Sequence, residues 1–351
     1  MQHRKVAIVI ENMAGKGGTE RVASGLANAL SRWPGYEVTL FSIAGEEAFF
    51  PLDRAVQLRF QRGRRWGWPW RLAVALRRGG FDAIIPISMG RLSVIMVPYL
   101  RLLCRNSRLL LSEHVSFHQY SRWMRWLKLA VYRLSDRVIL LTRQDRDAIA
   151  RWLAPDQCLV IENVSPFAPQ VMQTGQQYRL ALAVGRLSHQ KGFDRLITAW
   201  QQIATQATGW QLAIVGDGPE RRALQQQIVQ AGLTDSVQLV PATADVAEWY
   251  RRAGLFLMTS RYEGLPMVLI EAMSFGLPLV AYDCRTGPAE LIDDGCNGFL
   301  VADGDRQQFC RSTLALIGNP ALRQRFSQVS LEQAGRFAPE RIYPQWIQLI
   351  Q

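Results

Sequence analysis

Residues 180–207 read LALAVGRLSHQKGFDRLITAWQQIATQA, and this stretch shows the unit from which the chain is built. Its first five residues are apolar, a glycine-containing loop follows, and from Lys191 onward apolar side chains recur at helical spacing. A buried strand, a loop and a helix in this order are typical of a parallel sheet with crossover helices. If the unit recurs, the chain is expected to have an α/β fold.

The unit recurs on both sides of one candidate linker, Ser165–Gln177, which contains two prolines and a run of polar residues. After the linker, strands are expected at Leu180–Val184, Gln211–Val215, Val237–Val240, Leu255–Met258, Pro278–Ala281 and Phe299–Val301. Before it, strands are expected at Val6–Ile10, Val38–Phe41, Ala83–Pro86, Leu109–Ser112, Val138–Leu141 and Leu159–Ile161. Helical patterns lie between many of them, at Arg21–Leu30, Arg143–Trp152, Lys191–Ala207, Glu220–Gln230, Val246–Arg252 and Pro266–Phe275.

Two such series predict two Rossmann-like domains, each a doubly wound parallel sheet, with their strand C-terminal loops facing a shared cleft. Residues 1–170 are expected to form the first domain and residues 178–335 the second. The remaining segment, residues 336–351, contains a helical stretch at Pro339–Ile350 and is expected to cross back onto the first domain.

Composition narrows the class of protein. Hydrophobic residues make up 48% of the chain and charged residues 20%, a balance typical of globular proteins. The five cysteines are odd in number and include no CxxC pair, so a disulfide framework and a metal site are both disfavoured and a reducing compartment fits best. Val6–Ile10 is too short for a signal-peptide core, and Leu92–Leu100 falls short of the roughly 18 apolar residues of a membrane span. A cytoplasmic protein without a membrane span is expected.

The net charge of +12 lies entirely in the first half of the chain. Residues 1–176 carry 25 Lys and Arg against 13 Asp and Glu, whereas residues 177–351 carry 16 of each. Such an asymmetry indicates that one half faces an anionic partner. Nucleic acid, an anionic membrane and a phosphorylated glycolipid are all compatible with the charge alone.

Two glycine-containing loops follow predicted strands. In Gly15–Glu20 (GKGGTE) the glycines would let backbone N–H groups approach a phosphate, and the alternative is a tight turn with Thr19 as the helix N-cap. In Gly185–Gly192 (GRLSHQKG) an arginine and a lysine could hold a diphosphate from two sides, and the alternative is a pair of solvated loop cations.

The sharpest local signal is Glu263–Glu271 (EGLPMVLIE). Pro266 suits the first position of a helix, which puts Glu263 just before the helix and Glu271 inside it. The residues between Pro266 and Glu271 are apolar, so the helix is expected to be buried and Glu271 to accept hydrogen bonds, for which ribose hydroxyls are natural donors. The alternative is an internal salt bridge, with Arg261 as a candidate partner of Glu263.

Other patterns are weaker. Asp303-Gly304-Asp305 and Asp145-Arg146-Asp147 match a DxD metal pattern, but each lies where a helix should begin, so we interpret both as helix caps. His114 follows a predicted buried strand, where a histidine serves packing more often than chemistry. His189 is expected on the surface. The chain contains no Ser-His-Asp order of a hydrolase triad, no zincin motif and no kinase signature.

Taken together, these residues resemble the retaining glycosyltransferases of family 4, which have the GT-B fold. The resemblance runs over nearly the whole chain and is densest in Leu180–Val301. The matching blocks, in family order, are Gly185-Arg186 with Lys191-Gly192, Val215–Pro219, Ser260–Pro266 with Glu271-Ala272, Gly276–Pro278, Gly287–Glu290 and Asp294–Phe299.

The resemblance implies a role for each matching residue. Glu263 would meet the transferred sugar, Glu271 would hold the ribose, and Arg186 and Lys191 would neutralise the departing diphosphate. Backbone N–H groups near the start of the buried helix would stabilise the same charge, and the expected catalytic group is His114, Glu263, Arg186 and Lys191. The expected donor-binding residues are Gly17, Gly18, Gly185, Arg186, Lys191, Asp217, Gly218, Glu263, Gly264, Leu265, Met267, Val268 and Glu271.

The resemblance also implies the reaction. A hexose or N-acetylhexosamine would pass from a nucleotide-diphosphate sugar, with a UDP-sugar favoured and GDP-mannose next, to a glycan or lipid-linked acceptor in surface-polysaccharide or lipopolysaccharide synthesis. In the expected front-face mechanism the leaving phosphate helps to deprotonate the acceptor, so neither a metal nor a cofactor is expected.

The basic first half is interpreted as the side that faces the acceptor, because the resemblance implies that the acceptor binds mainly to the N-terminal domain. Arg62–Arg71 and Arg122–Arg133 both mix arginine with tryptophan, a combination suited to an anionic membrane surface. Peripheral binding to the inner face of the cytoplasmic membrane is therefore expected. The alternative is that the tryptophans belong to the core and the arginines between them are solvated.

Three other functions compete with this hypothesis. A nucleic-acid-binding protein would use the same charge and aromatic residues, but it would not need the buried glutamate motif, so no nucleic-acid partner is expected. A dehydrogenase is disfavoured because neither half has a complete GxGxxG followed by an acidic residue. A sugar-nucleotide epimerase or hydrolase on the same fold stays open.

Overall fold

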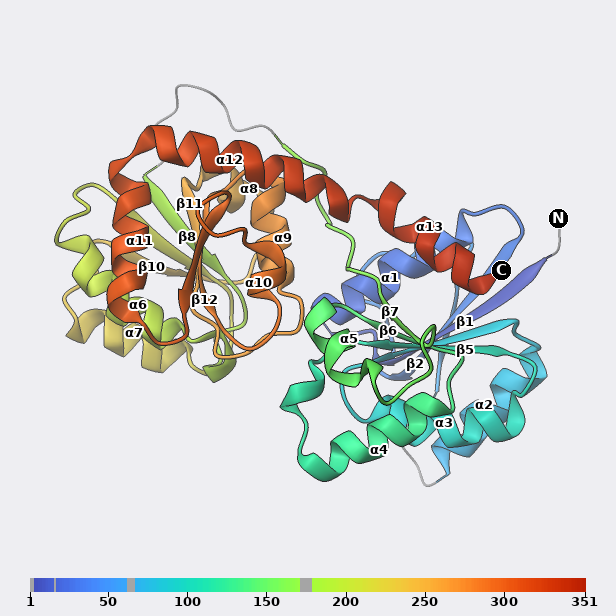
Figure 1. Cartoon of the computed structure of the whole chain (residues 1–351). Coiled ribbons are helices and arrows are strands. Elements are labelled where there is room, and N and C mark those ends of the chain that lie inside the picture. The colour runs from blue at the N-terminus through green and yellow to red at the C-terminus, as the bar shows by residue number, and fades with distance from the viewer. Residues whose placement is uncertain (1–2, 16, 62–66, 171–178) are drawn as a thin grey trace. The chain divides into compact units, whose positions relative to one another are not determined.

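The computed structural model describes residues 3–15, 17–61, 67–170 and 179–351 (Figure 1). The chain divides into two compact units. Unit 1 comprises the residues up to Val164 together with Pro339–Gln351, and unit 2 comprises Ser165–Ala338. Each unit is built on one parallel sheet, which confirms the predicted fold class.

Unit 1 contains a seven-stranded sheet in the order β3-β2-β1-β4-β5-β6-β7. Its strands are β1 (Arg4–Asn12), β2 (Tyr36–Ala44), β3 (Gln57–Phe60), β4 (Ala83–Ser88), β5 (Arg108–Glu113), β6 (Arg137–Leu140) and β7 (Cys158–Val160). All neighbouring strands pair in parallel, as in Val6 with Val38 and Val6 with Ala83. The order reverses direction between β1 and β4, which makes this the topological switch point of the sheet.

Helices cover both faces of this sheet. They are α1 (Gly18–Ser31), α2 (Trp68–Gly79), α3 (Leu92–Leu103), α4 (Arg122–Arg133), α5 (Arg143–Ala150) and α13 (Pro339–Ile350), with a short 3₁₀ helix at Phe117–Gln119. Alternate residues of β1 point to opposite faces: Ala7 and Val9 pack with α2 to α5, whereas Val6 and Ile8 pack with α1 and α13. The layer formed by α2, α3 and α4 is therefore separated from α1 and α13 by the sheet.

The C-terminal helix α13 lies in unit 1, although the chain reaches it from unit 2. It buries Ile342, Trp346 and Ile347 in the same cluster as α1 and one face of the sheet. The contact is close, because a β-carbon added to Gly25 of α1 would lie 2.8 Å from the Tyr343 hydroxyl. The buried apolar side chains of α13 thus complete the core of unit 1.

Unit 2 contains a six-stranded sheet in the order β10-β9-β8-β11-β12-β13. Its strands are β8 (Leu180–Val184), β9 (Gln211–Val215), β10 (Val237–Val240), β11 (Leu255–Met258), β12 (Leu279–Asp283) and β13 (Gly298–Ala302). Its α-helices are α6 (Phe193–Ala204), α7 (Arg221–Gln230), α8 (Val246–Arg252), α9 (Met267–Ser274), α10 (Pro288–Leu291), α11 (Arg306–Gly318) and α12 (Pro320–Ala334), with 3₁₀ helices at His189–Lys191 and Gly335–Phe337. Here the switch point lies between β8 and β11.

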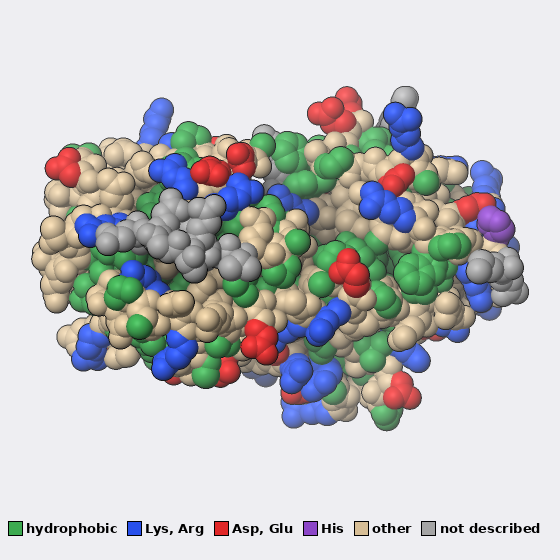
Figure 2. All heavy atoms as spheres, turned by 90° about the horizontal axis from the view of Figure 1, so that it is seen from above, with side chains coloured by type: hydrophobic (Ala, Val, Ile, Leu, Met, Phe, Trp, Pro, Cys, Tyr) green, Lys and Arg blue, Asp and Glu red, His purple; other side chains and the backbone are tan. Residues whose placement is uncertain are grey.

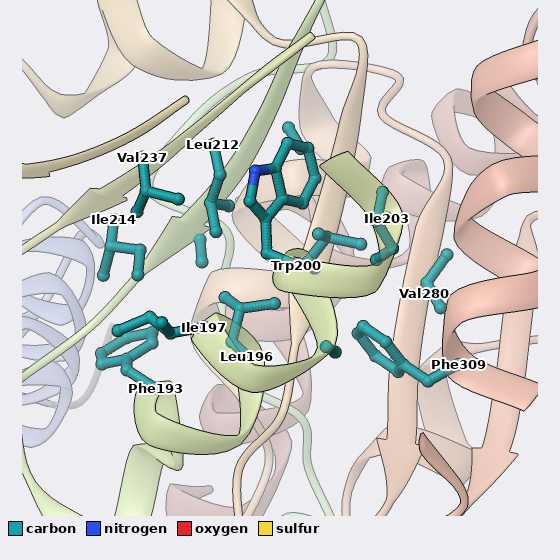
Figure 3. Close-up of a cluster of buried hydrophobic side chains, with 14 of the residues drawn as sticks. Phe193, Leu196, Ile197, Trp200, Ile203, Leu212, Ile214, Val237, Val280 and Phe309 are labelled. Carbon is teal, nitrogen blue, oxygen red and sulfur yellow. The ribbon is translucent and has the colours of Figure 1, made fainter. Parts of the chain in front are cut away.

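The core of unit 2 explains why its first strand-loop-helix unit is so well defined. Trp200, near the middle of α6, is completely buried and packs with Leu196, Ile203 and Leu212 (Figure 3). The apolar side of α6 thus fastens the helix to the sheet. Because the helix cannot shift, the loop between β8 and α6 is held at the carboxyl edge of the sheet.

Candidate functional site

Two loops of unit 2 flank its switch point at the carboxyl edge of the sheet. The first follows β8 and carries Gly185, Arg186 and Lys191, and the second follows β11 and carries Glu263. Because β8 and β11 are neighbours in the sheet, the ends of these strands, and hence the two loops, lie side by side. In open α/β sheets this is where ligands bind.

A lysine and a glutamate join the two loops. The Lys191 ammonium lies 2.6 Å from Oε1 of Glu263, and the Ser260 hydroxyl donates to the same oxygen at 2.7 Å. The Glu263 side chain is 7% exposed and that of Lys191 18%, so the pair is largely shielded from solvent. A buried carboxylate and an ammonium are thereby held at fixed positions beside the switch point.

The same two loops are tied together by further bonds around this pair. The Arg261 guanidinium holds both carboxylate oxygens of Asp194, at 2.9 and 2.6 Å, and this contact lowers the pKa of Asp194. The internal salt bridge of Glu263 that was expected as the alternative is thus formed, but its partner is Lys191, whereas Arg261 pairs with Asp194. The Thr259 hydroxyl donates to the Gly192 carbonyl at 2.9 Å. Gly192 has a φ of 65°, and a β-carbon there would lie 2.2 Å from the Thr259 carbonyl oxygen, so only glycine fits.

A third loop fixes the backbone of Glu263. Thr286 has a φ of 65°, an unfavourable conformation for a β-branched residue. Its hydroxyl donates to the Glu263 carbonyl at 2.6 Å. The next residue, Gly287, approaches so closely that a β-carbon would lie 2.2 Å from the Gly264 carbonyl oxygen. Strain of this kind persists where the surroundings enforce it, and here it positions the turn that presents Glu263.

Glu271 is buried within α9, as expected, and accepts a hydrogen bond from the Tyr250 hydroxyl at 2.8 Å. The Tyr250 ring is stacked on Phe275 with the ring centroids 5.3 Å apart. This packing holds the hydroxyl, and through it the carboxylate, in one orientation. Pro266 is the N-cap of α9 rather than its first helical residue, one position from the expectation.

The remaining predicted residues of unit 2 lie on the same edge. Arg186 is exposed on the loop after β8. Asp217 is ion-paired with Arg221 at 3.2 Å and accepts from the Ala242 N–H at 2.9 Å. A β-carbon on Gly218 would lie 2.2 Å from the Leu187 carbonyl oxygen, so this glycine allows the loops after β8 and β9 to touch.

Sequence reasoning missed Ser260, Thr286 and Tyr250. Ser260 and Thr286 lie in or beside the blocks that carried the resemblance, so their position in the chain was the available signal. Tyr250 had none, because its contact with Glu271 joins two residues that lie 21 positions apart on different helices.

The predicted residues of unit 1 lie at its own carboxyl edge. Gly17 is the N-cap of α1 and Gly18 its first residue. Thr19 lies inside the helix and donates its hydroxyl to the Met89 sulfur, so Thr19 is not the N-cap. Lys16 is outside the described residues.

His114 directly follows β5. Its N–H donates to the Ser88 carbonyl at 3.0 Å, and its Nε2 lies 3.0 Å from the Ser112 hydroxyl. Burial lowers the pKa of the imidazole to about 4. The ring is therefore neutral at pH 7, a state in which one nitrogen donates a hydrogen bond and the other accepts one.

This environment predicts a pH-dependent loss of stability. Because the folded pKa is about 4 against an ordinary value of 6.5, the unfolded state binds a proton that the folded state refuses. The free energy of unfolding should fall as the pH is lowered through that window. His114→Asn should weaken this dependence, whereas His189→Asn, which removes an exposed imidazole, should not. An NMR titration that finds His114 ionising near 6.5 would contradict the prediction.

The two DxD patterns have structural partners. Asp305 is the N-cap of α11 and accepts from the Gln308 N–H. Asp145 lies in the first turn of α5, where Thr142 is the N-cap, and it accepts from the Ser116 hydroxyl at 2.8 Å. The capping interpretation is right for Asp305, whereas Asp145 braces the cap from inside the helix. Across the described residues, no group of three His, Cys, Asp or Glu side chains could hold a metal ion.

Family models match both halves of the chain. Residues 16–164 match the model described as Glycosyltransferase Family 4, and residues 166–332 match Glycosyl transferases group 1. Nearly every residue discussed above falls within these two matches.

Individual proteins are similar over almost the full length. The chain is 36% identical to the amylovoran biosynthesis glycosyltransferase AmsD of Erwinia amylovora, over 97% of this chain and 98% of that protein. The lipopolysaccharide outer core galactosyltransferase WaaB, in its apo form, has a TM-score of 0.76 at 20% identity and covers 99% of both chains. Anabaena Alr3699/HepE, in complex with UDP-glucose, has a TM-score of 0.80 at 19% identity with the same coverage. These two structures share the GT-B fold with this chain.

Proposed function

This chain belongs to the family 4 glycosyltransferases, and on that premise we propose that it transfers a hexose or N-acetylhexosamine, with retention, from a nucleotide-diphosphate sugar to a hydroxyl of a glycan or lipid-linked acceptor. The observation that carries the proposal is the shielded Lys191–Glu263 pair at the switch point of unit 2. It provides a fixed cation for a leaving diphosphate beside a fixed carboxylate for sugar hydroxyls.

Surface-polysaccharide or lipopolysaccharide synthesis is the proposed setting. AmsD, which this chain matches over nearly its full length, is named for amylovoran biosynthesis, and WaaB for the lipopolysaccharide outer core. A UDP-sugar is the favoured donor, since Alr3699/HepE binds UDP-glucose on the same fold, with GDP-mannose next. We place the enzyme in the cytoplasm, bound peripherally to the inner face of the membrane.

Each residue of unit 2 has a part in the proposed reaction. As the bond between the anomeric carbon and the phosphate oxygen breaks, negative charge develops on the diphosphate. Lys191, Arg186 and the backbone N–H groups at the start of α9 stabilise that charge. The acceptor oxygen bonds to the anomeric carbon from the same face, and its proton passes to the leaving phosphate. Glu263 holds the sugar and Glu271 the ribose, so neither carboxylate acts as a nucleophile.

No metal is required in this proposal, because the cationic and N–H groups supply the charge that a divalent ion would otherwise provide. His114 is assigned to the donor sugar as a neutral hydrogen-bonding group. Gly17 and Gly18 are assigned to donor binding, as the family resemblance implies.

Binding of a nucleoside diphosphate tests the proposal. At 100 times its dissociation constant, a ligand of the folded state should raise the free energy of unfolding by about 2.7 kcal/mol. We expect UDP, or failing that GDP, to raise the melting temperature selectively among UDP, GDP, ADP, CMP and NAD. The shift should persist in excess EDTA and disappear in Glu271→Ala.

Glu248→Ala is the matched control, since Glu248 is an exposed glutamate of α8, the helix that also carries Tyr250. It should respond to the nucleotide like the wild type. Stabilisation by NAD alone, or by none of the nucleotides, would contradict the proposed function.

A further inference from the structure

Three consecutive helices of unit 1 contain no acidic residue. Together α2, α3 and α4 carry seven arginines and one lysine, and no aspartate or glutamate. Helix α3 packs against both α2 and α4, so the three form one layer on the sheet (Figure 1). By contrast, the face of the molecule in Figure 2 shows acidic and basic side chains near one another. The α2–α4 layer is therefore distinctive in charge.

The layer also presents much of the exposed apolar surface. Thirteen large apolar side chains are exposed among the described residues, and eight of them belong to this layer or to the residue that ends α4. The eight are Trp70, Ile95, Tyr99, Leu102, Trp123, Trp126, Leu127 and Leu134. The alternative that the tryptophans of this region are core residues is wrong for Trp70, Trp123 and Trp126.

Helix α4 shows how the surface is built. Trp123 and Trp126 are 64% and 61% exposed, and with Leu127 and Leu134 they recur at the three- and four-residue spacing of one helical side. The opposite side is buried through Leu129 and other core residues. The helix is thus apolar on both sides, and one of these sides has no part in the core.

Helix α3 repeats this arrangement, which sequence reasoning did not foresee. Ile95, Tyr99 and Leu102 are exposed at the same spacing, while its other side packs on the sheet. The Tyr99 ring lies 6.4 Å from that of Trp70, which extends the apolar surface onto α2. The aromatic side chains therefore run across neighbouring helices.

Exposed arginines lie in the first or last turns of these helices or just before them, and two of them, Arg71 and Arg133, directly adjoin exposed apolar residues. Arg77 and Arg78 occupy the last turn of α2, Arg91 precedes α3, and Arg122 begins α4. Part of the predicted basic segment, residues 62–66, lies outside the described residues. An apolar middle bordered by cations matches a bilayer interface, where apolar and indole groups enter the headgroup region and arginines meet lipid phosphates.

We propose that the outer side of the α2–α4 layer is the surface through which this protein binds an anionic lipid bilayer. Across the described residues no helix is long and apolar enough to cross a membrane, and the proposed contact is interfacial, with Trp123, Trp126 and the α3 side chains in the headgroup region. The inference deepens the proposed function and rests on it only for the acceptor: a lipid-linked acceptor lies in the membrane that this surface would meet.

Charge decides between a bilayer and a second copy of the chain. In a symmetric dimer the same surface would face itself, and arginine would meet arginine with no acidic side chain from these helices between them. Anionic lipid headgroups supply the opposite charge. The bilayer is therefore the occupant that the observations favour.

The test is flotation of the full chain with vesicles of phosphatidylcholine, with and without phosphatidylglycerol. We expect binding to the anionic vesicles, weakened on the order of tenfold or more in the double variant Trp123→Ser/Trp126→Ser. Arg77→Gln/Arg78→Gln should mainly reduce the preference for phosphatidylglycerol. Trp33→Ser is the matched control, because Trp33 is also exposed but lies outside the layer, and it should bind like the wild type.

Nucleotide-dependent thermal shifts in the same variants separate the two proposals. An unchanged shift in Trp123→Ser/Trp126→Ser would show an intact fold and donor site, so a loss of flotation would then be specific to the surface. If vesicles bind but no nucleotide does, the proposed function fails while this inference stands. The inference is overturned if the wild type ignores anionic vesicles, if Trp33→Ser weakens flotation as much as the double variant, or if light scattering finds a dimer that the double variant abolishes.

Discussion

Replacing Lys191 by glutamine is expected to lower the rate of sugar transfer by a factor of about 10² to 10³, the usual cost of removing one group that stabilises developing charge. The ammonium is 18% exposed and 2.6 Å from Glu263, so it is a positioned cation rather than a mobile surface lysine. Its loss removes charge stabilisation from the departing diphosphate and also removes the counter-charge of the Glu263 carboxylate. The fall should appear in kcat, measured as nucleoside diphosphate released from a sugar donor that carries the nucleotide identified by the thermal shift.

Arg195→Gln is the matched control for Lys191→Gln. Arg195 lies four residues further on, and its guanidinium is paired with Asp303 at 2.5 Å, but it contacts none of the predicted site residues in the structure described. Losing this ion pair should leave kcat within a few-fold of the wild type. Equal losses in the two variants would mean that the edge of the sheet merely loses structure, and an active Lys191→Gln would remove Lys191 from the reaction.

The alternation of apolar runs and helical patterns was sufficient to predict two parallel sheets. Strands that are buried on both faces of a sheet appear in the sequence as continuous apolar runs. This pattern failed to predict elements whose side chains are only partly buried. The edge strand β3 (Gln57–Phe60) alternates exposed and half-buried side chains and contains no apolar run. The run Leu92–Leu100, which is too short for a membrane span, belongs to α3, whose apolar side chains contribute to the core on one side and to an exposed surface on the other.

The candidate site was predictable as a set of loops but not as a set of contacts. The family resemblance implied that Lys191 and Glu263 belong to one site although they are 72 residues apart, and the strand order of the structure explains this by placing the loops after β8 and β11 together. The pairing of individual side chains within these loops depends on three-dimensional packing. Arg261 reaches Asp194 rather than its near neighbour Glu263 because the loop after β11 lies along the start of α6. No one-dimensional pattern contains that information.

The second large effect is expected inside unit 1, where Lys128→Met should lower the stability by about 3–5 kcal/mol, the usual cost of breaking a buried ion pair from one side. Lys128 is completely buried, and its ammonium lies 2.7 Å from Oε2 of Glu113, 3.2 Å from the Ser93 hydroxyl and 4.5 Å from the centre of the Tyr120 ring. Without Lys128, the carboxylate of Glu113 stays in the core without its counter-charge. Hydrogen exchange followed by mass spectrometry measures this loss in unit 1 separately from unit 2.

The double variant Glu113→Gln/Lys128→Met should recover much of the lost stability, because no unpaired charge is left behind. Arg122→Met, which removes an exposed cation from the same helix, should change stability by less than about 0.5 kcal/mol. The pair fastens α4, whose outer side carries Trp123 and Trp126, to the end of β5, where Glu113 is followed by His114. If Lys128→Met exchanged as slowly as the wild type, this link between the exposed tryptophans and the strand end would carry no stability and the prediction would be wrong.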